Sequence, residues 1–321
     1  MKLKKIISVI TALSITAALC VSLSGCGEKK TKYKVGICQL VQHEALDAAT
    51  KGFKEALKEK LGDDVEFDEQ NAAGEPNNCT TIVNQFVSGK VDLIFANATG
   101  ALQAAVSATD SIPIVGTSIT DYATALEISD WTGKTGINVT GTSDLAPLED
   151  QAKMIKELLP NAKTVGILYC SGEANSKYQA TEVAKYLKEL GIESKEFTSA
   201  DSNDLAQVVT SACAAVDAIY IPTDNTMASN TEIVNNIAEP AKIPIIAGEQ
   251  GICKGCGIAT LSIDYYSIGK KAGEMAYDIL VNGKDPADME IGFASSLTKK
   301  YMESRCQKLG ITVPSDYEAI Q

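Results

Sequence analysis

The same order of segments occurs twice in this chain of 321 residues. In each half, short apolar runs typical of strands alternate with amphipathic runs typical of helices. The predicted strands of the first half begin at Val35, Val65, Val91 and Ile112, and their counterparts begin at Val165, Ile192, Val216 and Ile243. Counterparts are 130, 127, 125 and 131 residues apart. This regular spacing predicts two copies of one domain.

The alternation also predicts the fold class, which is α/β with two doubly wound, Rossmann-like lobes. Each apolar strand is bounded by Gly, Pro or Asn and followed by a helix. Such a pattern is typical of a parallel sheet that helices cover on both faces through right-handed crossovers. Ligands of these sheets bind beyond the carboxyl ends of the strands. Two lobes that face each other would therefore form a ligand cleft.

The tail beyond the repeat predicts further connections between the lobes. Residues 257–284 have the pattern of a strand, a turn and a long helix, and residues 295–311 have that of a final helix. We expect the long helix to pack on lobe 1, so that three connections near residues 138–142, 261–264 and 290–294 form a hinge. Lobe 1 would then contain residues 35–140 and 264–292, and lobe 2 would contain residues 141–263 and 293–321.

The N-terminus resembles a bacterial lipoprotein leader. Three lysines precede an apolar run and the lipobox-like Leu23-Ser24-Gly25-Cys26, which predicts a signal peptide over residues 1–25, lipidation of Cys26 and a tether over residues 26–34. An uncleaved membrane anchor over Ile6–Leu23 is the alternative. Cleavage would remove three lysines and no acids, so the formal charge would change from -12 to -15. This acidity argues against nucleic acid as a partner. We expect a lipid anchor on the extracytoplasmic face of the cell membrane.

No motif for catalysis or cofactor binding is complete. His43 is the single histidine, no GxSxG sequence is present, and residues 136–143 have the glycine spacing of a phosphate loop with Thr142 in place of the lysine. Cys253 and Cys256 form a CxxC without a second pair or a nearby histidine for zinc. We therefore expect that the protein is not an enzyme and binds no cofactor or metal. We expect the two cysteines of the CxxC to lie in a loop, either without a catalytic role or as a local disulfide.

Polar residues follow the predicted strands in both halves. They are Gln39, His43, Thr99, Thr117, Ser118 and Asp121 in the first half, and Glu173, Asn175, Ser176, Thr223, Asp224 and Asn225 in the second. Hydroxyl groups and helix N-termini suit a carboxylate, and Asp121, Asp224 and Asp264 are candidates for binding an ammonium group, so a zwitterion would satisfy both sets. Helix capping is the alternative for Thr99, Asn175, Ser176 and Asp224, and a solvent-facing helix position is the alternative for His43.

Six motifs in order give the chain a family resemblance. They are residues 39–47 (QLVQHEALD), 112–121 (IPIVGTSITD), 137–144 (INVTGTSD), 172–176 (GEANS), 221–225 (IPTDN) and 263–269 (IDYYSIG). From about Tyr33 to Pro314 the chain resembles the substrate-binding lipoproteins of ABC importers, in the subfamily for tryptophan, tyrosine or phenylalanine uptake. The resemblance implies the periplasmic-binding-protein type I fold, with two lobes and three hinge strands. It also implies a monomer that captures a small ligand, commonly an aromatic amino acid, and delivers it to a permease.

The resemblance also implies a role for each motif residue. Gln39 and His43 would wall the ligand from lobe 1, Thr117, Ser118 and Asp121 would meet its polar head, and Ser143 and Asp144 would lie at the hinge. Glu173, Asn175, Ser176, Asp224, Asn225 and Asp264 would close from lobe 2. An aromatic ligand would also need a flat partner, for which the candidates are Trp131, Tyr169, Tyr178, Tyr265 and Tyr266, with a core position as the alternative for each.

Two departures from the family pattern leave the ligand open. Glu44 and Tyr122 stand where proline often occurs in the family, beside expected ligand contacts. A nucleoside, purine or sugar receptor of the same fold is therefore the alternative function, although Arg305 is the single arginine and sugar sites favour several. An enzyme or sensor domain is a third possibility, because fold by itself does not determine function.

Overall fold

The computed structural model describes residues 32–321, which form two α/β lobes, each built on its own sheet. The predicted signal peptide, Cys26 and most of the predicted tether lie outside the described residues. The first strand begins two residues earlier than predicted, because Tyr33 and Lys34 pair with Val65 and Glu66. None of the helices within residues 32–321 has the length and apolarity that a bilayer span requires.

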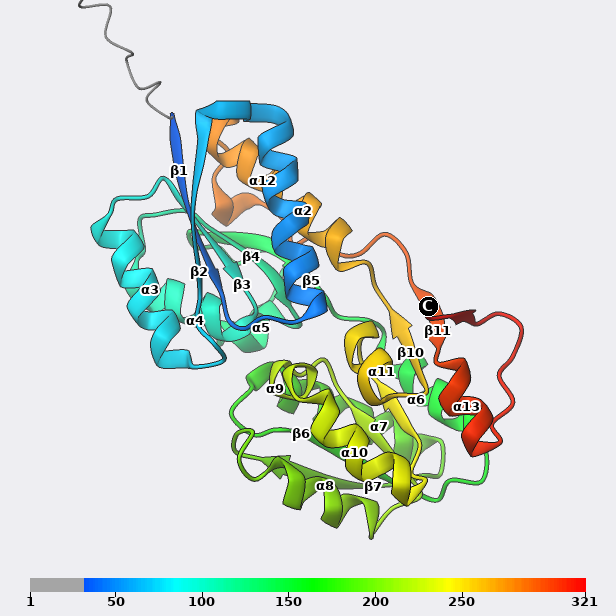
Figure 1. Cartoon of the computed structure of the whole chain (residues 1–321). Helices are drawn as coiled ribbons and strands as arrows, with labels where there is room; N and C mark the ends of the chain where they lie inside the picture. The colour runs from blue at the N-terminus through cyan, green and yellow to red at the C-terminus, as the bar shows by residue number, and fades with distance from the viewer. Residues whose placement is uncertain (1–31) are drawn as a thin grey trace, which may run out of the picture. The chain divides into compact units, whose positions relative to one another are not determined.

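The first sheet has the strand order β2-β1-β3-β4-β5, and all its neighbouring strands are parallel. Its strands are β1 (Tyr33–Gln39), β2 (Val65–Asn71), β3 (Leu93–Asn97), β4 (Ile114–Ile119) and β5 (Val139–Ser143). Its helices are α2 (Glu44–Leu61), α3 (Pro76–Ser88), α4 (Thr99–Ala108), α5 (Tyr122–Ala125) and α12 (Tyr265–Asn282), with the 3-10 helices η1 (Gly62–Asp64) and η2 (Pro286–Asp288). Helices α3 and α4 pack together, and α12 packs along α2 (Figure 1).

Both faces of the first sheet are buried, as the continuous apolar strands predict. Val35 and Ile37 of β1 lie in a core with Phe53 of α2. The opposite face of β1 carries Cys38, which lies in a second core with Phe86 of α3. Successive side chains of a strand point to opposite faces, so one strand contributes to both cores.

Helices α2 and α12 approach so closely that glycine is required at their contact. A Cβ atom on Gly52 would lie 2.2 Å from the carbonyl oxygen of Tyr266, and one on Gly269 would lie 2.0 Å from the carbonyl oxygen of Ala49. Any larger residue would force the helices apart. These glycines are the local reason that the long C-terminal helix packs on the first lobe.

The second sheet has the order β12-β11-β10-β9-β8-β6-β7. Its strands are β6 (Thr164–Cys170), β7 (Glu193–Ser199), β8 (Ala218–Ile221), β9 (Ile245–Ala247), β10 (Ala259–Ser262), β11 (Thr298–Tyr301) and β12 (Glu318–Ala319). Its helices are α6 (Leu148–Leu158), α7 (Ala174–Glu189), α8 (Leu205–Cys213), α9 (Asn225–Ser229), α10 (Thr231–Ala241), α11 (Gln250–Cys256) and α13 (Glu303–Leu309). Strand β11 runs antiparallel to β10, and the other neighbouring strands are parallel.

Three local predictions in the second half were wrong or incomplete. The predicted final helix contains strand β11 before α13, because residues 298–301 pair with β10. Cys253 and Cys256 lie in helix α11 rather than in a loop, and both are buried free thiols. Helix α6, which the repeat pattern did not predict, buries Met154 and Ile155.

Within residues 32–321, the chain passes between the two sheets three times. It leaves the first sheet after β5 and enters the second at β6. It leaves the second sheet after β10, and the following helix α12 packs along α2. It returns after Gly292, which pairs with Thr142 of β5, and enters β11.

Candidate functional site

A small cavity is enclosed by residues that follow strands of both sheets. Seven of the 15 predicted ligand-binding residues line it: His43, Ser118, Asp144, Asn175, Asp224, Asn225 and Tyr265. Five further residues complete the lining: Thr223, which was predicted only as a strand-end residue, and Leu46, Thr120, Ala228 and Glu249, which were not predicted. The cavity volume is about 10 Å³, which is space for about one water molecule. The two lobes therefore meet closely around it.

His43 links the lobes at this cavity. It precedes the first turn of α2 with an extended backbone, and its Nε2 atom lies 3.3 Å from the Oδ1 atom of Asn225. Burial lowers the pKa of His43 below its usual value, in spite of this hydrogen bond. The imidazole is therefore neutral at pH 7. Its buried Nδ1 atom has no protein partner, which leaves it available to a ligand.

Ser118 presents a second unpartnered polar atom to the cavity. Its backbone has a φ of 55°, which is uncommon for a residue other than glycine. The register between β4 and β5 shifts between Gly116 and Ile119, so Ser118 lies in an irregularity of the strand. Its buried Oγ atom has no protein partner. Strained backbone and an orphan hydroxyl together are typical of a functional position.

Asp144 is held between groups that follow β4 and β10. Its carboxylate accepts hydrogen bonds from Thr120 Oγ1 at 3.0 Å and from Tyr265 Oη at 2.9 Å. Burial raises the pKa of Asp144 to about 6, since desolvation outweighs the stabilisation from these two donors. The predicted hinge residue thus places a carboxyl group in the cavity wall.

Glu173 organises the start of helix α9 and so positions Asn225. Its Oε2 atom accepts from the backbone N–H of Asn225 at 3.0 Å and from its Nδ2 atom at 2.7 Å. Its Oε1 atom accepts from the backbone N–H and hydroxyl of Thr226 at 2.8 and 2.9 Å. The Nδ2 atom of Asn175 also donates to the Oε2 atom of Glu173 at 3.2 Å. With five donors already bound, Glu173 acts through Asn225, whose Oδ1 atom faces His43.

Asp224 both caps helix α9 and lines the cavity. Its carboxylate accepts from the backbone N–H groups of Met227 at 2.8 Å and Cys170 at 2.7 Å. Burial and then the charge of Glu173 raise the pKa of Asp224 to about 8. The capping alternative and the site prediction are therefore both compatible with its position.

Glu249 is the acidic residue that the sequence reasoning missed. It caps helix α11 through the backbone N–H groups of Gly251 and Ile252, and its side chain is 3% exposed. Burial raises its pKa to about 7. It follows strand β9, so the rule that identified the other strand-end residues would also have identified Glu249. Thr223 and Thr120 follow strands β8 and β4 in the same way.

The charge in this cavity is one-sided. Asp144, Asp224 and Glu249 all line it, whereas no lysine or arginine of residues 32–321 does. Buried carboxylates without a cationic partner are costly. The cavity therefore favours a bound group with positive charge.

Two predicted residues lie in a larger adjoining cleft of about 670 Å³. Thr99, at the start of α4, and Glu173 line it, together with Asn175 and Asn225 of the small cavity. Its volume falls in the range typical of small-molecule pockets. The two spaces share residues after β6 and β8, so the cleft leads directly to the small cavity.

Six predicted residues line neither space, and their polar groups have structural partners. They are Gln39, Thr117, Asp121, Ser143, Ser176 and Asp264.

Gln39 is the clearest of the six. Its Nε2 atom donates to Val41 and to Asp47 at 2.6 Å, and its Oε1 atom accepts from Thr50 at 2.6 Å. Its amide is therefore occupied inside lobe 1. Asp121 and Asp264 cap α5 and α12 by accepting backbone N–H groups.

The other three lie close behind the cavity wall. Thr117 pairs with Thr142 at 2.9 Å, and the hydroxyl of Ser143 donates to the carbonyl of Thr120 at 2.9 Å. Ser176 is fully buried, and its hydrogen bond to Asp224 favours the charged form of that carboxyl group. These residues support cavity residues without lining the cavity themselves.

Within residues 32–321, no group of three or more His, Cys, Asp or Glu side chains is arranged to hold a metal ion.

The family described as ABC transporter substrate binding protein matches residues 34–319. The chain belongs to this family. The resemblance inferred from the six motifs is therefore confirmed, as is the type I periplasmic-binding fold.

Three similar proteins agree with this assignment. A tyrosine-binding protein of Clostridioides difficile is 38% identical over 307 residues, which are 90% of this chain and 88% of that protein. A Streptococcus pneumonia domain solved in complex with L-Trp is 35% identical with a TM-score of 0.85, over 88% of this chain and 96% of that one. A ligand-free, open substrate-binding protein of Clostridium difficile is 37% identical with a TM-score of 0.68, over 90% of this chain and 99% of that one.

Proposed function

We propose that this substrate-binding protein captures an aromatic amino acid, namely tryptophan, tyrosine or phenylalanine, between its lobes and delivers it to an ABC permease. The observation that carries the proposal is the small cavity at the strand ends of both sheets. It combines three buried carboxyl groups without a cation and two buried polar atoms without a partner. An amino acid supplies the missing ammonium group and further hydrogen-bonding atoms. The tyrosine-binding relative and the L-Trp complex support an aromatic side chain.

The proposed mechanism is capture by closure of the lobes. A cavity of about 10 Å³ cannot admit an amino acid, so the lobes must separate before the ligand enters. The chain superposes better on the L-Trp complex than on the open, ligand-free structure, although both are about equally similar in sequence. This difference supports a closed arrangement. A ligand that contacts both lobes would shift the population toward that state.

His43 and Asn225 would form the latch of the closed state. Their side chains come from α2 and α9 and meet at 3.3 Å. The neutral imidazole of His43 would hold the ligand rather than transfer protons, since the nearby groups form no catalytic arrangement. The protein would thus act as a carrier and not as an enzyme.

The remaining parts of the proposal concern attachment and lobe boundaries. The lipobox-like sequence supports acylation of Cys26 and anchorage on the extracytoplasmic face of the membrane. Membership of the family supports a monomer. The three passages between the sheets support lobe 1 as residues 35–140 and 264–292, and lobe 2 as residues 141–263 and 293–321, although residues 141–143 of β5 still pair with β4 of the first sheet. These passages would serve as the hinge.

Calorimetric titration of purified residues 27–321 with the twenty protein amino acids, adenosine and glucose tests the ligand. Saturable binding of tryptophan, tyrosine or phenylalanine, with weaker or no binding of the others, is the expected result. Binding of adenosine or glucose without any amino acid would refute the ligand assignment and favour the nucleoside or sugar alternative. Mass spectrometry of small molecules released from the denatured protein provides an independent identification of the ligand.

A further inference from the structure

Glu249 is a buried carboxyl group in the cavity wall, and the charged neighbours that shift its pKa are also acidic. The charges of Glu44 and Asp144 both raise its pKa, after the larger effect of burial. Its two oxygens accept backbone N–H groups of α11, and each retains a lone pair for a further donor. A capping aspartate would satisfy the helix with a shorter side chain. Capping by itself therefore does not explain why a glutamate lines this cavity.

The cations near Glu249 are engaged elsewhere. Lys254 lies 3.6 Å from the carboxylate of Glu44, and Lys300 donates to the Oε1 atom of Gln250 at 2.6 Å. Neither lysine lines the small cavity. The charge of Glu249 is thus left for a group that enters the cavity from outside.

A second observation points to a ligand at the same place. The Oγ atom of Ser118 and the Nδ1 atom of His43 are both buried without a partner, and both residues line the cavity with Glu249. Buried polar atoms in native proteins are nearly always satisfied. Orphan atoms beside an unbalanced carboxylate indicate space for a polar, positively charged group.

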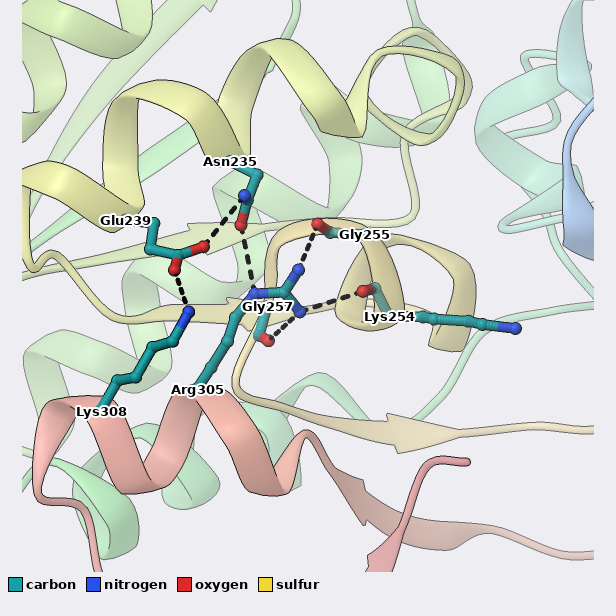
Figure 2. Close-up of polar contacts among 7 residues, drawn as sticks. All are labelled: Asn235, Glu239, Lys254, Gly255, Gly257, Arg305 and Lys308. Atoms are coloured by element: carbon teal, nitrogen blue, oxygen red, sulfur yellow. Dashed lines mark hydrogen bonds and ion pairs between the residues drawn. The ribbon is translucent and has the colours of Figure 1, made fainter.

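The other end of helix α11 is fixed by Arg305 of helix α13, as Figure 2 shows. Its guanidinium donates to the carbonyl oxygens of Cys253, Lys254, Gly255 and Gly257 at 2.5 to 3.2 Å. Its Nε atom also donates to Asn235 Oδ1 of α10 at 3.1 Å. These are the carbonyl groups that a helix leaves without partners at its C-terminus.

The outer side of this cluster is completed by an ion pair. Asn235 donates to Glu239 at 3.1 Å, and Glu239 is also paired with Lys308 (Figure 2). Helix α11 has seven residues, so a rigid hold at Gly255 and Gly257 constrains Glu249 at the opposite end. Arg305 thereby connects the C-terminal helix with the cavity.

We propose that Glu249 binds the ammonium group of the ligand, and that Arg305 positions Glu249 by fixing helix α11. The inference rests on the proposed amino acid function and deepens it, because it identifies the residue that distinguishes amino acids from uncharged or purely anionic analogues. In this arrangement Glu249 contacts the ligand, whereas Arg305 acts through α11.

The test compares each amino acid with its des-amino analogue. The wild-type protein is titrated with L-tyrosine and 3-(4-hydroxyphenyl)propionate, and with L-tryptophan and indole-3-propionate. We expect the amino acid to bind roughly 10- to 100-fold more tightly than its analogue, as a charge-assisted hydrogen bond predicts. Equal affinities in the wild type would overturn the inference. If the wild type binds neither these four compounds nor L-phenylalanine, the proposed function itself fails.

Variants then assign the selectivity to particular residues. Glu249→Gln retains an oxygen that can cap α11, and we expect it to lose most of the selectivity for the amino acid over the analogue. Arg305→Lys should lose part of the selectivity, since lysine cannot bind the same set of carbonyls. Glu303→Gln removes a charge from an exposed position of the same helix α13, where the side chain accepts from Gln307, and is the matched control, with unchanged selectivity expected.

Selectivity that survives Glu249→Gln would overturn the ammonium assignment, because another group would then bind the ammonium. An equal loss of affinity for amino acid and analogue in Arg305→Lys would overturn the positioning role and reveal general destabilisation. Should Glu249→Gln fail to fold, the wild-type comparison still decides whether an ammonium-selective site exists, and Arg305→Lys still reports on its position.

Discussion

The buried carboxyl group of Asp144 should make the stability of the closed protein depend on pH. Burial raises its pKa from 3.8 to about 6. Between these values the folded state binds more protons than the unfolded state, so the free energy of unfolding decreases as the pH rises. The penalty from Asp144 is absent below the unfolded value of 3.8 and is complete above the folded value of about 6.

Asp144→Asn removes this penalty while keeping the size of the side chain. The difference between 3.8 and about 6 corresponds to roughly 3 kcal/mol. We therefore expect the variant to be more stable than the wild type by up to about 3 kcal/mol at a pH of about 7.5, and by only about 1 kcal/mol at a pH of about 4.5. The amide can still accept from Thr120 or interact with the hydroxyl of Tyr265, so most local contacts remain.

Urea unfolding of both proteins across this pH range measures the difference. The difference between the free energies of unfolding of the two proteins isolates the contribution of Asp144 from those of the other buried acids, Asp224 and Glu249. A stability difference that does not change with pH, or a variant that is less stable at neutral pH, would refute the account. Asp217→Asn is a control of opposite sign, because backbone N–H groups of Thr164 and Lys163 lower the pKa of Asp217. That variant should lose stability at neutral pH and approach the wild type as the pH falls through the folded pKa of Asp217.

Three further predictions concern the latch, the helix contact and the α9 network. His43→Ala should weaken amino acid binding by about 1 kcal/mol or more by removing the contact with Asn225, and calorimetry that finds unchanged affinity would exclude this latch. Gly269→Ala should lower the free energy of unfolding by roughly 1 to 3 kcal/mol, since the new methyl group would overlap the carbonyl of Ala49; a melting temperature equal to that of the wild type would contradict the packing. Glu173→Gln should weaken binding without contacting the ligand, by loosening the start of α9, and a crystal structure with an unchanged α9 and unchanged affinity would count against it.

Much of the architecture could be predicted because it depends on local pattern. The apolar runs at Val35 and Val165 begin β1 and β6 nearly where predicted, and each is followed by the expected helix. Strand β11 could not be predicted in this way. Residues 298–301 form a strand only because β10, which is distant in sequence, offers its edge, and a local pattern contains no information about such a partner.

The site was predicted in outline and not in detail. The strand-end rule identified His43, Ser118 and Asp224, which line the cavity, and the family resemblance identified Asp144. The rule also identified Gln39, whose amide is hydrogen-bonded within its own lobe. Sequence shows that a polar residue ends a strand. It does not show whether its hydrogen bonds are satisfied by neighbours or left for a ligand, and it did not single out Glu249.

The sequence by itself determined the duplicated α/β alternation, the parallel sheets and the edge at which polar groups gather, because these follow from periodicities of a few residues and from the chirality of crossovers. Only the tertiary structure decided which side chains share the cavity. Ser118 from lobe 1 and Glu249 from lobe 2 are separated by more than a hundred residues, and their proximity results from the three passages of the chain between the sheets. The raised pKa values of Asp144, Asp224 and Glu249 are a consequence of burial, which exists only once both lobes have folded.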